Sequence, residues 1–407
     1  MRARLATMLG VILALATVTA GQAAPKQADA RFATFNVSLN RATQGKLASD
    51  LADPTADTVF VRQAKNVAEV IQRTRPDVLL VNEFDHDPVA VDRFRDNFLE
   101  VSQNGAAPID YPYAFLAPSN TGIPSGKDLD NSGTIGGGND AFGFGAFPGQ
   151  FGMLVLSRFP IDMAHVRTFQ VFLWKDMPGN LIPTPFYSAD EVDILRLSSK
   201  SHWDVPIQIG KKSVHFLVSH PTPPVFDGAE DRNGRRNYDE IRFWADYITP
   251  GRADYIYDDA GAHGGLVAGS LFVIAGDENS DPLDGDSVPG AIQQLIEHPL
   301  VNTKTVPESA GAVEAARLQG GANASHKSDP RFDTADFADT APGNLHADYV
   351  LPRKAIQITD AAVFWPLQSD PLFRLVGVFD FATWGPVGGF PTSDHRLVWA
   401  DLTLPAA

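Results

Sequence analysis

The stretch "FVIAGDENSDP" at residues 272–282 decides the fold and raises the question of function. Phe272–Ala275 is an apolar run without polar alternation, which is typical of a strand buried on both faces. Gly276 allows a tight turn, and the polar residues 277–279 follow at once. In open α/β sheets, ligands tend to bind beyond the carboxyl ends of the strands. Polar residues after a strand also form ordinary turns, so this stretch alone is compatible with a site and with a turn.

Apolar runs and helical spacing alternate along the rest of the chain. The other predicted strands are residues 31–37, 77–84, 151–161, 200–207, 213–221, 346–352 and 395–404. Three helices are predicted. The first has apolar residues at helical spacing from Val61 to Ile71 and ends at Arg75-Pro76. The second is amphipathic over 238–248, and the third lies near 291–299. The run 213–221 is apolar on both faces, which predicts a central strand. No repeat or linker divides the chain, so we predict a single domain over residues 24–407.

Two long segments, 117–150 and 304–345, interrupt this alternation and are expected to be long loops. Loops of this length are usually functional or disordered. The first is rich in Gly, Ser and Asn but is accompanied by phenylalanines, namely Phe142, Phe144, Phe147 and Phe151. This composition favours a packed lid with glycine hinges, which we expect to control substrate choice.

The first residues, "MRARLATMLGVILALATVTAGQAA", combine two arginines, an apolar stretch and a small-residue end. This pattern predicts a secretory signal peptide over residues 1–23, cut after Ala23 or Ala24. Thr17, Thr19 and Gly21 interrupt the apolar run before it reaches the ~20 residues that a membrane span needs. We therefore expect a secreted or periplasmic protein without a membrane span.

Composition limits the possible chemistry. The 407 residues carry a formal net charge of −16, and loss of Arg2 and Arg4 with the signal peptide makes it −18. Such a chain is not suited to binding polyanions through a broad basic surface. It has no cysteine, so neither disulfides nor thiol chemistry are available.

Side chains capable of chemistry recur at the boundaries of the predicted strands. They are Asn36, Glu83, His220, Asp277, Asn279, Asp348, Asp394 and His395. Each has a structural alternative, such as Glu83 as an ion-pair partner, His220 as a core histidine or Asp394 as a turn residue. Together they predict a site assembled along one edge of a sheet.

Six short motifs carry a family resemblance. They are "TFN" at 34–36, "NE" at 82–83, "SH" at 219–220, "GDEN" at 276–279, "DY" at 348–349 and "SDH" at 393–395. In this order the chain resembles the endonuclease/exonuclease/phosphatase superfamily, which includes deoxyribonuclease I, exonuclease III-like repair enzymes, sphingomyelinases and inositol polyphosphate 5-phosphatases. The resemblance spans residues 31–404. It implies a four-layer α/β sandwich, in which two mixed β-sheets pack together with helices outside.

The resemblance also implies a metal site. Glu83 would be the principal ligand of a divalent cation, with Asn36 beside it and Asp394 close by. Carboxylate and amide oxygens without thiols suit Mg²⁺ best, with Mn²⁺ or Ca²⁺ as alternatives. Repair-type members often carry a further carboxylate where this chain has Ser38, which weakens the case for a second metal or for specificity toward apurinic sites.

The remaining motif residues have implied catalytic roles. His395 would contact the scissile phosphate, and Asp348 would hold its imidazole in one tautomer. Asp277 would orient or deprotonate the attacking water. Asn279 would donate hydrogen bonds to the pentavalent phosphate, and His220 would bond a phosphate oxygen or protonate the leaving group.

The stretch "RNGRRN" at 232–237, just before the predicted helix at 238–248, has two interpretations. Exposed arginines at the start of a helix are commonly only solvated. Alternatively, Arg235 or Arg236 could bind a substrate phosphate at the helix N-terminus.

We therefore expect an exported, divalent-metal-dependent phosphoric-ester hydrolase that acts on small or lipid-derived phosphoesters by in-line attack of water. The alternatives are an extracellular nuclease, with nucleic acid as substrate only, and a catalytically silent envelope or binding protein. The acidic composition favours small substrates, and the competent side chains at every main catalytic position argue against a silent protein. No obligate protein partner is inferred.

Overall fold

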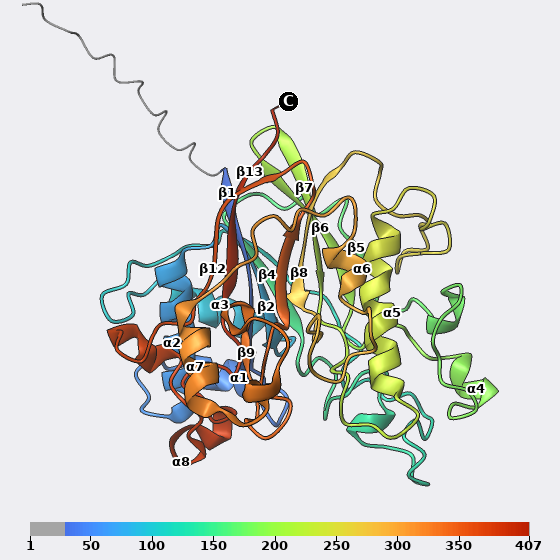
Figure 1. Cartoon of the computed structure of the whole chain (residues 1–407), viewed down its shortest axis with the longest axis horizontal. Coiled ribbons are helices and arrows are strands. Elements are labelled where there is room, and N and C mark those ends of the chain that lie inside the picture. The colour runs from blue at the N-terminus through green and yellow to red at the C-terminus, as the bar shows by residue number, and fades with distance from the viewer. Residues whose placement is uncertain (1–28, 407) are drawn as a thin grey trace, which may run out of the picture.

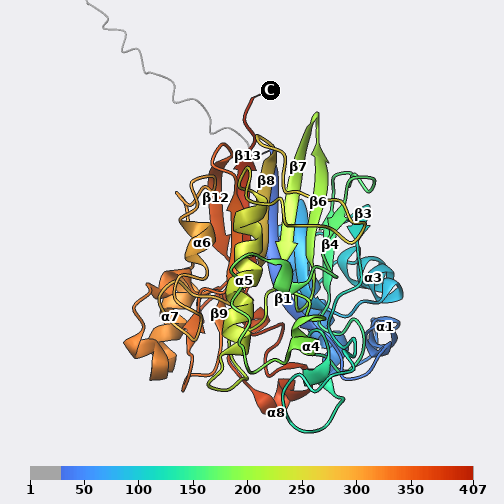
Figure 2. The same cartoon turned by 90° about the vertical axis from the view of Figure 1, so that its right-hand side faces the viewer.

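The protein is an α/β sandwich of two packed β-sheets with helices on both outer faces, as Figures 1 and 2 show. The computed structural model describes residues 29–406, so the predicted signal peptide lies outside the described residues. The predicted fold class is confirmed. Among the described residues, no helix has the length and apolar character that a membrane crossing requires.

The first sheet has six strands in the order β12-β13-β1-β2-β4-β3. Strands β1 and β2 are parallel and all other neighbours are antiparallel, so the sheet is mixed. The strands are β1 (Ala30–Leu39), β2 (Val78–Phe84), β3 (Tyr113–Phe115), β4 (Met153–Ser157), β12 (Gln357–Val363) and β13 (Val398–Thr403).

The second sheet has five strands in the order β11-β8-β7-β6-β5, with β7 and β8 parallel. Its central strand β7 is the one predicted from the apolar run at 213–221. The strands are β5 (Arg167–Thr168), β6 (His202–Ile209), β7 (Lys212–Ser219), β8 (Leu271–Asp277) and β11 (Asp348–Pro352). A separate ribbon pairs β9 (Ala335–Asp336) with β10 (Asn344–Leu345).

The helices cover the two outer faces of the sandwich. In Figure 1, α2 and α7 lie on one side of the sheets, and α5 and α6 lie on the other. The helices are α1 (Lys46–Leu51), α2 (Val59–Thr74), α3 (Pro88–Phe94), α4 (Ala189–Val192), α5 (Arg232–Tyr247), α6 (Gln293–Ile296), α7 (Ala310–Gln319) and α8 (Phe381–Trp384).

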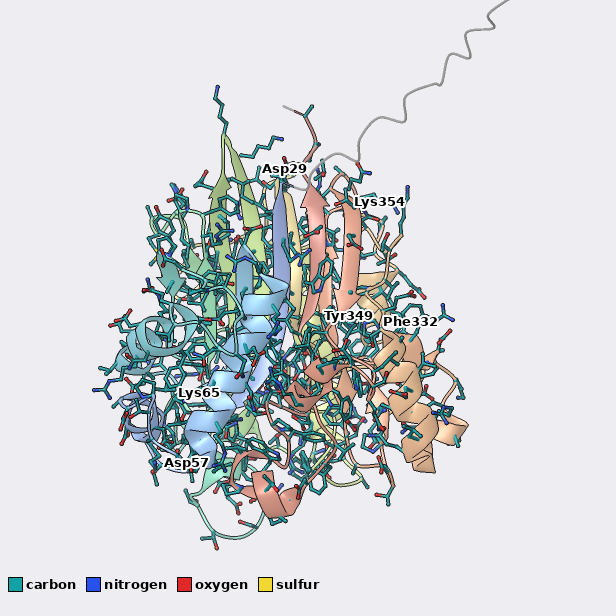
Figure 3. All side chains as sticks on the ribbon, turned by 90° about the vertical axis from the view of Figure 1, so that its left-hand side faces the viewer. Asp29, Asp57, Lys65, Phe332, Tyr349 and Lys354 are labelled. Atoms are coloured by element: carbon teal, nitrogen blue, oxygen red, sulfur yellow. The ribbon has the colours of Figure 1, made fainter. Side chains whose placement is uncertain are left out.

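Helix α2 forms because its apolar residues recur at helical spacing and both ends are capped. Its N-cap Thr58 accepts a hydrogen bond from the Val61 amide, and Arg75 ends the helix in the left-handed region ahead of Pro76. Lys65 faces outward from this helix in Figure 3, whereas Val67 is fully buried. The apolar stripe therefore attaches the helix to the first sheet.

The central core lies between the two sheets. Phe32 of the first sheet meets Phe216 of the second edge-to-face, with ring centroids 5.4 Å apart. Phe115 and Trp203 make a similar contact at 5.0 Å. These side chains are buried, and each removes apolar surface worth roughly 1.5–3 kcal/mol from water. The apolar inner faces thus hold the two sheets in fixed alignment.

Several elements differ from the sequence predictions. Helix α5 begins at Arg232, so Arg235 and Arg236 lie inside the helix rather than before it. The segment 304–345 is not a plain loop, because it contains α7, 3₁₀ turns and the ribbon of β9 and β10. Ser309 caps α7 by accepting the Ala312 amide. The alanine-rich sequence of α7 has too weak an apolar periodicity to be found by pattern.

Other predicted boundaries also changed. The strand predicted at 151–161 is only β4, and the helix predicted near 291–299 is reduced to α6. The edge strand β12 was not predicted, because most of its residues are exposed or half-buried and show no apolar face. The segment 117–150 does lack long elements, and its one regular helical turn is the 3₁₀ turn at Gly138–Asp140.

Candidate active site

The site is built where the central strands of both sheets end. Asn36 projects from β1 of the first sheet, and Asp277 is the last residue of β8 in the second. The Asn36 side-chain nitrogen Nδ2 donates a hydrogen bond to Asp277 Oδ2 at 3.1 Å. Both side chains are buried. Packing of the sheets therefore brings together two groups that are far apart in the sequence.

A carboxylate–histidine arrangement lies beside this contact. Strand register pairs Asp348 with Asp277, so their side chains share one face of the sheet. His395 Nδ1 is 2.8 Å from Asp348 Oδ2, and His395 Nε2 is 3.5 Å from Asp277 Oδ2. Burial lowers the pKa of His395, but the Asp348 and Asp277 carboxylates outweigh burial and hold it well above its usual value. The imidazole is therefore held in its charged form between two acids.

Thr334 supports this arrangement and was missed by the sequence analysis. Its hydroxyl Oγ1 donates to Asp348 Oδ2 at 2.8 Å and accepts the amides of Ala347 and Asp348. The contact depends on the fold of the segment 304–345, for which the sequence had no recognisable signal. On the other side of Asp348, the Tyr349 hydroxyl (Figure 3) lies 2.8 Å from the Ser280 carbonyl oxygen and ties down the loop after β8.

His220 approaches Asp277 from the end of β7. Its Nε2 is 3.3 Å from Asp277 Oδ2, and its Nδ1 is buried without a hydrogen-bond partner. Burial, reinforced by nearby positive charge, holds the pKa of His220 well below its usual value. The surroundings of the two histidines therefore act in opposite directions, favouring the charged form of His395 and the neutral form of His220. Burial also raises the pKa of Asp277, and the His395 charge partly offsets that effect.

The stretch after β8 is both a turn and part of the site. Asn279 lies in the left-handed region, with φ of 50°, and its amide donates to Asp277 Oδ1 at 3.1 Å. Its side-chain Nδ2 donates to the Pro221 carbonyl at 3.1 Å. Glu278 is buried against the Ser219 hydroxyl, and burial raises its pKa to about 8. Asp277 and Asn279 line the adjacent cavity, whereas Glu278 does not.

The predicted metal ligands form an oxygen-rich group. Glu83 and Asp394 line the same cavity, and neither forms an ion pair with a cationic side chain of the described residues. Burial and then the Asp394 charge raise the pKa of Glu83. Asn40 Nδ2 donates to Glu83 Oε2 at 2.9 Å, and Asn36 Oδ1 accepts only the Ser38 amide. Two carboxylates without an ion-pair partner, together with an amide oxygen, fit a hard divalent cation.

A second combination of ligand atoms is also present. Asp277, Asp348 and His395 each offer one atom, and these atoms lie within 4.8 Å of one another. In the structure, His395 Nδ1 is already engaged by Asp348. The described residues thus contain acidic and histidine groups that could hold a divalent ion.

Two cavities flank these residues. The larger, of about 640 Å³, is lined by most of the predicted catalytic residues and is called the catalytic pocket; the smaller, of about 500 Å³, is called the lateral pocket. Both are lined by Glu83, His220, Pro223, Val225 and Phe226. The loop that carries Phe226, which is 87% exposed, therefore borders both pockets.

The long segments supply the outer walls. Residues 337–345 line the catalytic pocket, where the Phe337 ring meets the His395 ring edge-on at 5.3 Å. Residues 129–144 line the lateral pocket, together with Phe151. Each long segment therefore forms a wall of one pocket.

The predicted arginines are not placed at the catalytic groups. Arg236 donates to the carbonyl oxygens of Leu197, Phe142, Arg196 and Ser198, so it ties the segment 117–150 to the chain ahead of β6. It lines the lateral pocket, whereas Arg235 lines neither pocket. Both arginines are thus parts of helix α5, and Arg236 also holds segments together through carbonyl oxygens; binding of a substrate phosphate by either stays a prediction.

Lys200 is a second residue that the sequence analysis missed. It is only 7% exposed and lines the lateral pocket. Burial lowers its pKa, and the nearby carboxylates act in the opposite direction. A single lysine at the start of a predicted strand has no sequence signal that separates it from a solvated one.

Comparisons with known proteins agree with this geometry. A family model described as "Endonuclease/Exonuclease/phosphatase family" matches residues 33–395. No curated protein sequence matches the chain.

Solved structures are similar at low identity. An endonuclease/exonuclease/phosphatase from Beutenbergia cavernae DSM 12333 has 17% identity and a TM-score of 0.49, with 94% of this chain and 73% of that chain covered. A family protein from Leptotrichia buccalis C-1013-b has 14% identity and a TM-score of 0.45, with coverages of 92% and 100%. The human Nocturnin catalytic domain with bound sulfate has 14% identity and a TM-score of 0.44, with coverages of 92% and 94%.

Proposed function

The chain belongs to the endonuclease/exonuclease/phosphatase family, and from this premise we propose that it is a divalent-metal-dependent phosphoric-ester hydrolase acting on small or lipid-derived phosphoesters. The strongest support is the convergence of three nitrogen atoms on Asp277 Oδ2. They belong to Asn36, His220 and His395, at 3.1, 3.3 and 3.5 Å. A buried carboxylate in such a cluster can accept a proton from an attacking water.

The metal would be held by Glu83 and Asp394, with Asn36 next to them. Mg²⁺ suits this oxygen donor set best. When bound, the ion would supply positive charge that neutralises the phosphate oxygens. Burial, and after it the Asp394 charge, raises the pKa of Glu83, and a bound cation would offset both effects, which supports this assignment.

The remaining groups have distinct tasks in the proposed reaction. Asp277 orients the water and takes its proton, and its raised pKa makes it a better base near neutral pH. His395, kept charged by Asp348, donates a hydrogen bond from Nε2 to the phosphate. His220 lies beside Asp277 and would bond a phosphate oxygen, and its lowered pKa favours this role over protonation of the leaving group. Asn279 lines the same pocket and completes the set.

The pockets favour a small substrate over a polymer. Their volumes of about 640 and 500 Å³ are in the range of small-molecule sites. The net charge of −16 gives no broad attraction for a polyanion. An extracellular nuclease is the alternative within the same family.

The test is a substrate panel assayed with Mg²⁺, Mn²⁺, Ca²⁺ or a chelator. The substrates are plasmid DNA, bis(p-nitrophenyl) phosphate and p-nitrophenyl phosphate, with the Asp277→Asn variant as background control. We expect metal-dependent release of p-nitrophenolate and little nicking of DNA. Preferred cleavage of DNA would establish the nuclease alternative. Absence of turnover on all three substrates would favour a silent binding protein.

We also propose that the protein is exported, on the strength of residues 1–24 alone. N-terminal sequencing of protein recovered from the periplasm or medium should begin at Ala24 or Pro25. Recovery of an uncut chain from the cytoplasm would contradict this.

A further inference from the structure

The lateral pocket contains a cationic group that the proposed reaction does not use. Lys200 lines this pocket together with Glu83 and His220, which also line the catalytic pocket. Its ammonium group has no hydrogen bond, and no carboxylate within 4 Å, among residues 29–406. A ligand that enters the lateral pocket beside the catalytic groups would therefore meet an unpaired positive charge.

The backbone around Lys200 is firmly held. The buried carboxylate of Glu240 accepts the amides of Ser199 and Thr222, each at 2.6 Å, and so connects the residues next to Lys200 and Pro223. The Asn120 amide donates to the Lys200 carbonyl at 2.8 Å. The lysine is thus presented by a rigid framework and not by a mobile surface loop.

The other cations of this pocket are already engaged. Arg236 donates to backbone carbonyl oxygens, and Arg232 pairs with Glu230 and lies over the Phe186 ring. Lys200 is the cation of this pocket whose side chain makes no hydrogen bond and no ion pair within the described residues, whereas Arg236 uses Nε and Nη2 on carbonyl oxygens and has no carboxylate partner.

A purely structural role explains this placement poorly. Most of the Lys200 side chain is buried while its ammonium nitrogen stays accessible to the lateral pocket, so the charge loses part of its hydration, and a methionine of similar shape would fill the same space without that cost. The carboxylates of Glu83 and Glu240 lower this cost only from a distance. An anionic ligand that contacts the ammonium group would remove it.

We propose that Lys200 binds a second anionic group of the substrate, a phosphate in particular, while the scissile phosphate lies between Glu83 and His220. The inference rests on the proposed function and makes it more specific: the substrate class is phosphodiesters that carry a further phosphate on one arm. Lysine is a common phosphate ligand, because its compact charge needs no fixed approach direction.

The test uses p-nitrophenyl alkyl phosphodiesters of graded chain length, each ending in a methyl, carboxylate or phosphate group. Release of p-nitrophenolate gives kcat and KM for wild-type protein, Lys200→Met and Lys200→Arg. Lys211→Met is the control, since it removes the same charge from the exposed hairpin between β6 and β7. Thermal melting establishes that each variant is folded, and Lys200→Met should melt at or above the wild-type temperature.

At the chain length that reaches Lys200, we expect the phosphate-ended substrate to have a KM about 10- to 100-fold below that of the methyl-ended one. Lys200→Met should abolish this preference, so that the methyl- and phosphate-ended substrates have equal KM. Lys200→Arg should retain part of it, and Lys211→Met all of it. A preference for the carboxylate end over the phosphate end would overturn the phosphate assignment.

Two further results would overturn the inference. One is equal KM for methyl- and phosphate-ended substrates at every length. The other is retention of the full preference for the phosphate end in Lys200→Met, which would show that another group binds this phosphate. If neither a diester nor p-nitrophenyl phosphate is hydrolysed, the proposed function fails by itself. Calorimetric binding of alkyl mono- and bisphosphates then decides: tighter binding of bisphosphates by wild type than by Lys200→Met supports the inference, and equal binding refutes it.

Discussion

The two pockets share catalytic residues but have walls of different construction. The wall of the catalytic pocket belongs to the folded segment 304–345, which contacts the catalytic groups directly. Thr334 bonds Asp348, and the Asp336 amide donates to the Asp394 carbonyl at 2.7 Å. Buried Arg396 pairs with Asp336 at 2.9 Å. A change in this wall therefore reaches the reacting groups.

The wall of the lateral pocket is glycine-rich and packs by close backbone contact. A Cβ on Gly143 would lie 1.8 Å from the Ser199 carbonyl oxygen, and one on Gly122 would lie 1.9 Å from the Phe147 oxygen. These contacts shape the pocket, and no hydrogen bond joins residues 117–150 to Asp277, Asp348 or His395. From this difference we infer that the wall from segment 304–345 positions the reacting groups, whereas the wall from segment 117–150 shapes the space for the substrate.

The largest expected effect concerns the proposed metal ligands, of which Glu83 lines both pockets. Removal of divalent metal should abolish turnover of every substrate, because Glu83, Asn36 and Asp394 would lose the ion they are proposed to hold. Glu83→Gln should raise the metal concentration needed for half-maximal rate at least about tenfold. The measurement is rate against metal concentration after chelation. Full turnover by rigorously metal-free protein would contradict the prediction.

Asp277→Asn should come next in size, with a loss of about 10²–10⁴ in kcat on substrates that use either pocket. The amide cannot accept a proton from the attacking water. Folding should survive, because the change is nearly isosteric and lies at the end of β8. Measuring kcat and Tm on one preparation separates this role from that of a turn former. Wild-type kcat in the variant would make the stretch only a turn.

How much of the molecule the sequence predicts depends on the range of the interactions. Apolar runs such as Phe272–Ala275 predict buried strands because burial on both faces imposes local composition. The polar motif residues could be grouped because each lies next to the end of a predicted strand. The structure does bring three of them together, namely Asn36, Asp277 and His395. Their catalytic roles stay predictions.

The remainder depends on contacts between distant segments, which leave no local pattern. Thr334 reaches Asp348 only through the fold of residues 304–345, and Lys200 becomes unusual only after burial. The same applies to Arg236, whose spacing suggested a phosphate site but whose donors are used by backbone carbonyl oxygens. Sequence pattern identifies the core and the strand ends, and tertiary packing decides what the other polar side chains do.

A matched pair of aromatic truncations tests the two walls directly. Phe337→Ala should lower kcat, because it removes a ring packed against His395. Phe144→Ala should mainly raise KM, because its ring is 63% exposed on the wall of the lateral pocket. About 1 kcal/mol of aromatic contact corresponds to roughly a fivefold effect in each case. The readout is kcat and KM on one diester.

The opposite assignment, with kcat altered only by Phe144→Ala, would show that the lateral wall positions the chemistry. Equal changes in both parameters for both variants would remove the distinction between the walls. Tm measured on each variant guards against a general loss of structure.

The smallest effect concerns the pH dependence of stability. In the catalytic wall, Asp333 is 1% exposed, and burial together with neighbouring aspartates raises its pKa to about 9. The folded protein therefore keeps this proton at pH values where the unfolded chain, with a pKa near 3.9, has lost it. Stability should fall as pH rises through this window, because the folded state binds more protons. Asp333→Asn, which resembles the protonated acid, should abolish that part of the fall.

The measurement is Tm against pH from roughly 6 to 9 for wild type and variant, a range that lies within this window. The advantage of Asp333→Asn over wild type should grow steadily with pH. Asp130→Asn is the matched control in the lateral wall. There the hydrogen bond from Ser132 lowers the pKa of Asp130, so this group is ionised in both states throughout the range and its removal should add no pH dependence. If Asp333→Asn and wild type kept parallel profiles, Asp333 would be ionised in the folded protein. The catalytic wall would then tolerate a buried charge that its cluster of aspartates should exclude.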